Sequence, residues 1–212
     1  DKEDHGPMTA LALARLRQLS AHEVGHTLGL AHNFAASIND RASVMDYPHP
    51  LVTVATNGSI NMDKAYDNKI GIWDKRAIVY GYSTTNTPKA LQKIIADTKS
   101  LGLKYLSDPD ARPDGSAHAE AHLWDNGTNA VAELERIMQL RQSSLARFGA
   151  NSLATGQPFS ELEKILVPIY HMQRYQVEAV AKWIAGYTYA YDVKGEDPAG
   201  STKVVGLNEQ KQ

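Results

Sequence analysis

The chain has 212 residues, of which 42% are hydrophobic and 22% charged, a composition typical of a globular protein with one core and at most one appendage. Its formal net charge of -2 offers no basic surface to nucleic acid or to an anionic membrane, so neither is expected as a partner. The absence of cysteine excludes disulfides and thiol nucleophiles and leaves histidine and carboxylate side chains as candidate metal ligands. No apolar run is long enough to span a bilayer.

The first predicted element is one long helix over residues 9–28. Apolar residues recur there at near-helical spacing, and no proline interrupts them. Gly29 is the predicted end, because glycine readily adopts the left-handed conformation that closes a helix. Residues 39–68 are rich in Asn, Asp, Ser, Pro and Gly, which predicts a loop containing one small hairpin that turns at Asn57-Gly58.

Short helices are predicted next, over residues 74–80 and 88–100. The second of these begins with a proline, which favours the first turn of a helix. Residues 107–127 contain several prolines and glycines and are predicted to be a second loop-rich tract.

The C-terminal part is predicted to contain the two longest remaining helices. Residues 129–148 and 161–185 carry apolar side chains at three- and four-residue steps, and we expect them to form an antiparallel hairpin. The alternation of Tyr189 and Tyr191 permits a short strand, and the polar tail from Gly195 is expected to be loose. The predicted fold class is therefore mainly α, or α+β at most, with one small hairpin.

The segment with the clearest chemistry lies at the end of the first helix. Residues 22–32 read HEVGHTLGLAH and match HExxHxxGxxH at every fixed position. Because residues four apart share one helix face, the imidazoles of His22 and His26 can converge on one zinc ion at roughly 2.0–2.1 Å. Gly29 then reverses the chain, which His32 needs in order to reach the same metal.

This arrangement predicts a catalytic zinc site. Three neutral histidines leave a fourth position for water, and zinc lowers the pKa of that water towards about 7. Glu23 directly follows the first ligand, so its carboxylate can take the proton of the water during attack and pass it to the leaving amine. The alternative is a helix that carries these polar residues on an exposed face by chance.

A second motif follows across a short loop. Residues 43–47 read SVMDY, and HExxHxxGxxH followed by a Met-containing turn resembles the signature of the metzincin metallopeptidases. The resemblance implies that Met45 lies beneath the three imidazoles as an apolar floor. It also implies that Tyr47 ligates zinc or stabilises the transition state, as a tyrosine does in the astacin and serralysin branches. The alternative is that Tyr47 only packs in the turn before Pro48.

Within the metzincins, the chain resembles the bacterial Met-zincin domain of large zinc-dependent peptidases. Residues 110–115, 123–127 and 171–175 are similar to later segments of that family. The resemblance implies Zn²⁺ as the cofactor, a peptide or protein as the substrate, and an exported location, either periplasmic, outer-membrane-associated or secreted. A complete metzincin domain also places a twisted sheet before the zinc helix. We expect that sheet to lie upstream of Asp1 and the isolated chain to cleave peptides poorly.

The predicted organisation has two parts. Residues 1–82 are predicted to be the zinc-helix and Met-turn part of a catalytic domain, and residues 83–212 a helical subdomain with a long helical hairpin. The predicted function is a zinc endopeptidase. Two alternatives stay open: a non-catalytic zinc-binding module that docks a partner, against which the presence of Glu23 argues, and a zinc hydrolase with a substrate other than a peptide.

Other histidines carry weaker signals. His118 and His122 are four residues apart, but they lie in a loop-rich tract, which favours hydrogen bonding within the loop over a role near the active site. His49 lies between two prolines and is interpreted as an exposed loop histidine, with a substrate contact as the alternative.

The remaining candidates are acidic and aromatic. Asp108, Asp110 and Asp114 lack the EF-hand pattern and are interpreted as solvated turn residues, with calcium binding as the alternative. The aromatic residues from Trp183 to Tyr191 are interpreted as packing at a helix end rather than as a ligand platform.

Overall fold

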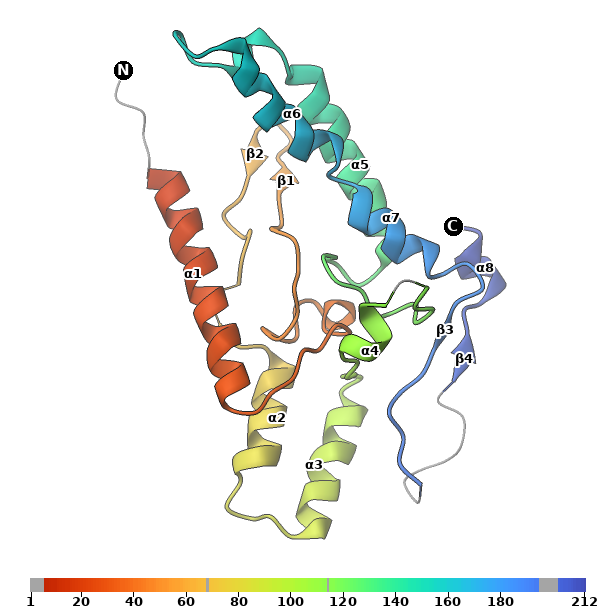
Figure 1. Ribbon diagram of the computed structural model, residues 1–212. Helices are drawn as coiled ribbons and strands as arrows, with labels where there is room; N and C mark the ends of the chain where they lie inside the picture. The colour runs from red at the N-terminus through yellow and green to blue at the C-terminus, as the bar shows by residue number, and fades with distance from the viewer. Residues whose placement is uncertain (1–5, 68, 114, 195–201) are drawn as a thin grey trace.

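The computed structural model describes residues 6–67, 69–113, 115–194 and 202–212. Within these ranges the chain is mainly helical, with two small antiparallel hairpins (Figure 1). The predicted fold class is confirmed, and the second hairpin is an addition to it. In the same ranges, no helix is both long and apolar enough to cross a membrane.

Helix α1 (Gly6–Thr27) begins three residues before the predicted start and ends as predicted. Gly29 has a φ of 83° and donates its N–H to the carbonyl of His26 at 2.9 Å. Leu30 donates its N–H to the carbonyl of Gly25 at 3.0 Å. This pair of bonds is a Schellman motif, which closes the helix and directs the chain back towards the molecule.

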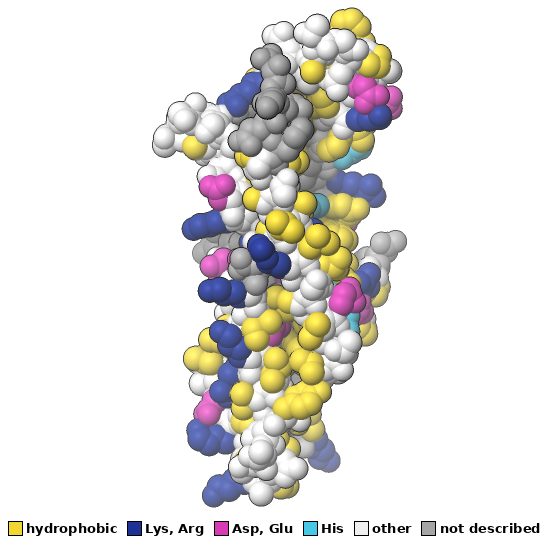
Figure 2. Space-filling model, turned by 90° about the vertical axis from the view of Figure 1, so that its left-hand side faces the viewer, with side chains coloured by type: hydrophobic (Ala, Val, Ile, Leu, Met, Phe, Trp, Pro, Cys, Tyr) yellow, Lys and Arg dark blue, Asp and Glu magenta, His cyan; other side chains and the backbone are white. Residues whose placement is uncertain are grey.

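Helix α1 contacts the rest of the described chain through a narrow face. Its buried residues are Gln18, His22 and Gly25. The opposite face exposes apolar side chains, and Figure 2 shows them gathered down that side of the molecule: Met8, Leu13, Leu16, Leu19 and Val24. The buried face of α1 is therefore the one that carries the first histidine of the motif.

The first hairpin and two helices follow. Strands β1 (Thr53–Val54) and β2 (Ile60–Asn61) pair in antiparallel register around Gly58, as predicted. Before them, a 3-10 turn η1 (Ser37–Asn39) leads to the Met-containing turn. Helices α2 (Ile72–Tyr82) and α3 (Pro88–Ser100) lie side by side below α1 in Figure 1.

The predicted helical hairpin forms, but its second arm is divided. Helix α5 (Ala130–Arg147) packs against both α6 (Leu162–Tyr170) and α7 (Arg174–Ala181), which run back along it (Figure 1). The prediction of one continuous helix over residues 161–185 was wrong. Pro168 lies inside α6, where it removes one helical hydrogen bond, and α6 ends two residues later.

The connection between these arms contains two 3-10 turns, η2 (Ala150–Ser152) and η3 (Phe159–Glu161). The loop-rich tract before α5 contains one short helix that was not predicted, α4 (Asp108–Ala111).

The C-terminal tail is ordered where it is described. Strand β3 (Tyr187–Thr188) pairs with β4 (Lys203–Val204), and a short helix α8 (Leu207–Gln210) follows. Residues 195–201 lie outside the described residues, but for 202–212 the prediction of a loose tail was wrong. The permitted strand also lies at 187–188 rather than at Tyr189 and Tyr191. Val205 is buried and donates its N–H to the carbonyl of Gly186 at 2.9 Å, which anchors the tail.

The buried core joins the segment after the zinc motif to the loop-rich tract. Its members are Phe34, Ala35, Leu106, Ala111 and Ala121, with Tyr47, Leu123 and Tyr189 packed against them. Phe34 donates its N–H to the carbonyl of Leu106 at 2.8 Å. This core fixes the chain on both sides of Phe34, and so positions His32 and Tyr47. The division of the chain at residue 82 stays a prediction.

Candidate metal centre

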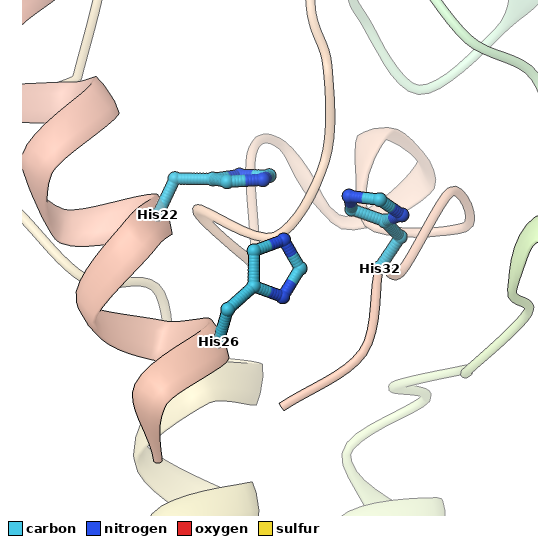
Figure 3. Close-up of side chains that lie close together, drawn as sticks. All are labelled: His22, His26 and His32. Carbon is cyan, nitrogen blue, oxygen red and sulfur yellow. The ribbon is translucent and has the colours of Figure 1, made fainter. Parts of the chain in front are cut away.

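The structure brings the three motif histidines together. His22 and His26 project from α1, and His32 faces them from the segment that follows the helix end (Figure 3). Ring centroids are 4.7 Å apart for His22 and His26, 4.8 Å for His26 and His32, and 5.3 Å for His22 and His32. Each residue offers one ligand atom, and these atoms all lie within 4.8 Å of one another.

Each of these imidazoles is held by its Nδ1 atom. His22 Nδ1 lies 2.7 Å from the carbonyl oxygen of Val44, and His26 Nδ1 lies 2.8 Å from that of Leu30. His32 Nδ1 lies 2.9 Å from a carboxylate oxygen of Asp108. Because all three partners only accept hydrogen bonds, Nδ1 must carry the proton, which leaves each Nε2 with a lone pair for a metal.

The donor set fits a zinc ion. Three neutral imidazoles with an open position are a ligand set typical of catalytic zinc. His22 is buried, and its Nε2 has no hydrogen-bond partner among the described residues. Burial lowers the pKa of His22, which favours the neutral form that binds metal. An ion at this position would satisfy the nitrogen that the protein leaves without a partner.

The Met-containing turn packs directly beneath the zinc helix. Met45 is fully buried, and a Cβ atom built on Gly25 would lie only 2.3 Å from its sulfur. The absence of a side chain at Gly25 therefore allows Met45 to approach the helix between the two histidines of the HExxH segment. The role of Met45 as a floor beneath the three imidazoles stays a prediction.

Asp74 holds this turn in place, although the sequence analysis did not identify it. Its buried carboxylate accepts hydrogen bonds from Ser43 Oγ at 2.5 Å and from the N–H groups of Val44 and Gly71 at 2.9 and 2.6 Å. Val44 is the residue whose carbonyl orients His22. An acidic residue in the first turn of α2 was visible in the sequence, but nothing there indicated that it contacts the Met-containing turn.

Tyr47 contacts the histidine group as well as packing in the turn. Its hydroxyl is 2.9 Å from His32 Nε2, the atom that is free to bind metal. Its ring stacks on His22 at 4.9 Å between centroids and on Trp124 at 5.6 Å. The hydroxyl can therefore donate a hydrogen bond to a group that binds between the histidines.

Asp108 is the main functional residue that the sequence analysis missed. The interpretation of Asp108 as a solvated turn residue was wrong, because its carboxylate contacts His32, Arg112 and Ser107. Partial burial raises the pKa of Asp108, but the hydrogen bonds from His32 and Arg112 outweigh it and hold the pKa below its ordinary value. Asp108 thus stays ionised and orients the third histidine. A Ser-Asp-Pro start of a short helix was visible in the sequence, but not its contact 76 residues away.

Glu23 is exposed and follows His22 on α1. Its catalytic role stays a prediction.

The other histidines lie outside the group of three. His118 is buried, and its Nδ1 accepts a hydrogen bond from the N–H of Glu120 at 3.2 Å, in keeping with hydrogen bonding within the tract. Its Nε2 also lies 2.9 Å from the carbonyl of Tyr189, which is outside the tract. His122 is buried, and the interpretation of His49 as exposed was wrong, since its ring is partly buried between Trp124 and Tyr175. Packing by these aromatic rings explains the burial of His49.

The remaining acidic candidates give no calcium site in the described part of the chain. Asp110 accepts hydrogen bonds from the hydroxyls of Tyr189 and Tyr191, so it joins the tract to the segment after β3. Asp114 lies outside the described residues. Tyr189 also packs against the buried core, whereas the predicted packing was at a helix end.

Comparison with known proteins gives one relationship. No curated protein and no solved structure matches the chain. A comparison with protein families matches residues 4–212, nearly the whole chain, to the family described as Met-zincin. The match includes the histidine group, the Met-containing turn and the loop-rich tract that holds His32. The chain belongs to the Met-zincin family and contains a domain of the zinc metallopeptidase type.

Proposed function

We propose that this chain carries the catalytic centre of a zinc-dependent endopeptidase. The observation that supports the proposal most strongly is that three imidazoles converge with each Nδ1 bound to an acceptor, so that each Nε2 keeps its lone pair for a metal. A structural zinc site would be closed by a fourth protein ligand. No fourth His, Cys, Asp or Glu joins the group in the described ranges, so a position is left for water and substrate.

The residues at the centre have distinct roles in the proposed reaction. His22, His26 and His32 would hold zinc, which supplies a Lewis acid for the scissile carbonyl and lowers the pKa of a bound water towards about 7. The carboxylate of Glu23 takes a proton from the attacking water and passes it to the nitrogen of the leaving amine. The hydroxyl of Tyr47 donates a hydrogen bond to the oxyanion that develops on the former carbonyl.

The proposal is tested with the intact protein on a peptide library, with and without a zinc chelator. We expect turnover that chelation removes and that added zinc restores. Glu23→Gln should lower kcat by roughly 10²- to 10⁴-fold while zinc content stays unchanged. Glu178→Gln, an exposed change on α7, serves as the matched control and should have no effect. Activity that survives Glu23→Gln, or that chelation leaves unchanged, contradicts the proposal.

Tyr47→Phe separates the role of the hydroxyl from that of the ring. The ring contacts with His22 and Trp124 remain, so zinc should still bind. We expect kcat to fall roughly 10²-fold with KM little changed, because the lost hydrogen bond forms mainly in the transition state. Tyr170→Phe, at an exposed ring on α6, is the control. An unchanged kcat would show that the Tyr47 hydroxyl has no catalytic role and that the residue only packs against its neighbours.

A further inference from the structure

We propose that Arg112 binds a carboxylate of the polypeptide substrate near the scissile bond, and so selects substrates that carry a carboxylate there. The proposal deepens the proposed function and rests on it, since it names the class of peptide that the centre prefers. The guanidinium of Arg112 lies against the ring of Tyr47, the tyrosine whose hydroxyl faces the histidines.

The position of Arg112 is fixed by its surroundings. Arg112 follows the last residue of α4 and donates its backbone N–H to the carbonyl of Asp108 at 3.0 Å. The preceding residue, Ala111, belongs to the buried core. The guanidinium carbon lies 5.5 Å from the centre of the fully buried Phe34 ring. Because these contacts already restrain Arg112, binding a ligand costs it little further conformational freedom.

The side chain of Arg112 is accessible, and its protein contacts use only part of it. It is 45% exposed, and its Nε donates a hydrogen bond to the carboxylate of Asp108. Among the described residues, neither Nη atom has a hydrogen-bond partner, and Asp108 is the one carboxylate within ion-pair distance. A guanidinium offers donors along more than one edge, so the two Nη atoms can hold a second carboxylate through two parallel hydrogen bonds.

The charge of Asp108 does not exclude a second carboxylate. Asp108 also accepts hydrogen bonds from His32 Nδ1 at 2.9 Å and from Ser107 Oγ at 3.2 Å. Its negative charge is therefore shared among three donors, whereas the positive charge of Arg112 meets one acceptor. A carboxylate matches the paired donors of Arg112 in both geometry and charge, and a cationic substrate group would be repelled.

The guanidinium lies within reach of a peptide held at the histidines. The hydroxyl of Tyr47 is 2.9 Å from His32 Nε2, and the guanidinium carbon is 5.6 Å from the centre of the same tyrosine ring. An extended peptide advances about 3.3–3.6 Å per residue. A side chain or chain end about two or three residues from the scissile carbonyl can therefore meet Arg112.

The test measures binding separately from cleavage. Zinc-loaded Glu23→Gln protein is titrated with end-capped, fluorescein-labelled peptides that carry Glu or the isosteric Gln at one position, scanned over three positions on each side of the central bond. At one position we expect the Glu peptide to bind about tenfold more tightly, as a charge-assisted hydrogen bond provides.

A second pair of peptides identifies the source of the carboxylate. These peptides contain no acidic residue, end two or three residues after the central bond, and differ in a free or an amidated C-terminus. A preference within the first set identifies an acidic side chain as the ligand, and a preference within the second identifies a chain end. Equal affinity within both sets would overturn the proposal.

Substitution of Arg112 locates the binding. Arg112→Gln should abolish the preference for the carboxylate and leave the affinity for the neutral peptide unchanged. Arg112→Lys keeps the charge without the paired donors and should retain only part of the preference. Arg174→Gln is the matched control, because Arg174 also lies over a tyrosine ring, that of Tyr175 at 5.3 Å, and faces Glu178 at 3.9 Å. The control should keep the full preference.

A different result is expected if Arg112 acts only by positioning Asp108. Arg112→Gln would then lower zinc affinity and weaken the binding of the charged and neutral peptides by the same factor. Competition with a chromophoric chelator measures the zinc affinity of the variant. A folded Arg112→Gln or Arg112→Lys variant that keeps the full preference, or that loses affinity for both peptides equally, contradicts the proposal.

The two proposals fail in different ways. A carboxylate preference that Arg112→Gln abolishes, without any hydrolysis by the wild-type protein, would support the role of Arg112 and contradict the peptidase. Zinc-dependent hydrolysis that is equally fast for the charged and neutral peptides and unchanged in Arg112→Gln would support the peptidase and contradict the role of Arg112.

Discussion

Residues 22–47 and residues 103–127 both contribute to the candidate metal centre, but they do so by different physical means. The first region carries its ligands at spacings that a helix and a glycine turn convert into geometry over a few residues. The second region has no comparable periodicity, and its contribution depends on tertiary contacts such as that between Phe34 and Leu106. Ligands whose positions are set by spacing within one helix and one turn can be recognised in a sequence. The groups that orient those ligands through tertiary contacts cannot be recognised in the same way.

The largest expected effect concerns the local region. His26→Ala removes one of three ligands, and we expect zinc affinity to fall on the order of 10³-fold. Competition with a chromophoric chelator measures the change. His171→Ala, at an exposed histidine, is the control and should bind zinc as the wild-type protein does. Equal zinc affinities for the two variants would show that His26 does not bind the metal.

The next prediction concerns the distant region. Asp108→Asn keeps the shape of the side chain but weakens its hold on His32 Nδ1, and we expect zinc affinity to fall by about 10- to 100-fold. Asp63→Asn, at an exposed loop carboxylate, is the control. The same chelator competition measures both variants. If Asp108→Asn matches the control, the second region contributes packing but no metal affinity.

A smaller effect is expected where the two motifs meet. Gly25→Ala places a Cβ against the sulfur of buried Met45, and we expect the free energy of unfolding to fall by about 1–3 kcal/mol. Gly81→Ala, in open space on α2, should instead gain up to about 1 kcal/mol from helix propensity. Urea unfolding of the metal-free proteins measures both changes. A stabilised Gly25→Ala variant would show that Met45 moves aside freely.

The smallest expected effect is the pH dependence of the second region. Burial, and then the charge of Lys182, lowers the pKa of His122 to about 4, whereas an unfolded histidine titrates near 6.5. Below about pH 6.5 the unfolded chain binds a proton that the folded chain does not. Stability from this residue is therefore present above that pH and is lost as the pH falls towards 4.

His122→Phe should remove this dependence. Between pH 7 and pH 5, we expect the variant to lose about 1–2 kcal/mol less stability than the wild-type protein. Urea unfolding of the chelated proteins at the two pH values provides the measurement, and His171→Phe is the control on an exposed histidine. An identical loss in wild type and His122→Phe would place the titrating groups elsewhere.

Much of the local structure was predictable from the sequence. The end of α1 at Gly29 follows from glycine conformation, and the hairpin at Asn57-Gly58 follows from turn chemistry. The grouping of the three histidines follows from helical spacing and that glycine turn. In each case the interaction that decides the structure lies within about ten residues.

Most features that were not predicted depend on partners that are distant in the sequence. Asp74 and Asp108 reach the centre through contacts 30 and 76 residues away, which no local pattern encodes. Strand β3 forms where β4 pairs with it, at Tyr187 and Thr188. The alternation of Tyr189 and Tyr191 in the sequence therefore predicted the wrong position for this strand. The second arm of the helical hairpin is divided between α6 and α7, but helical periodicity in the sequence continues through the break and concealed it.

The bond between His32 and Asp108 also links metal binding to folding. Zinc that prefers a correctly oriented His32 must, by thermodynamic linkage, stabilise the docking of the tract that holds Asp108 by the same free energy. At a free zinc concentration one hundred times the dissociation constant, linkage adds about 2.7 kcal/mol to the folded state. Tight zinc binding would therefore require that Asp108 has already docked against His32, although the two residues are far apart in the chain.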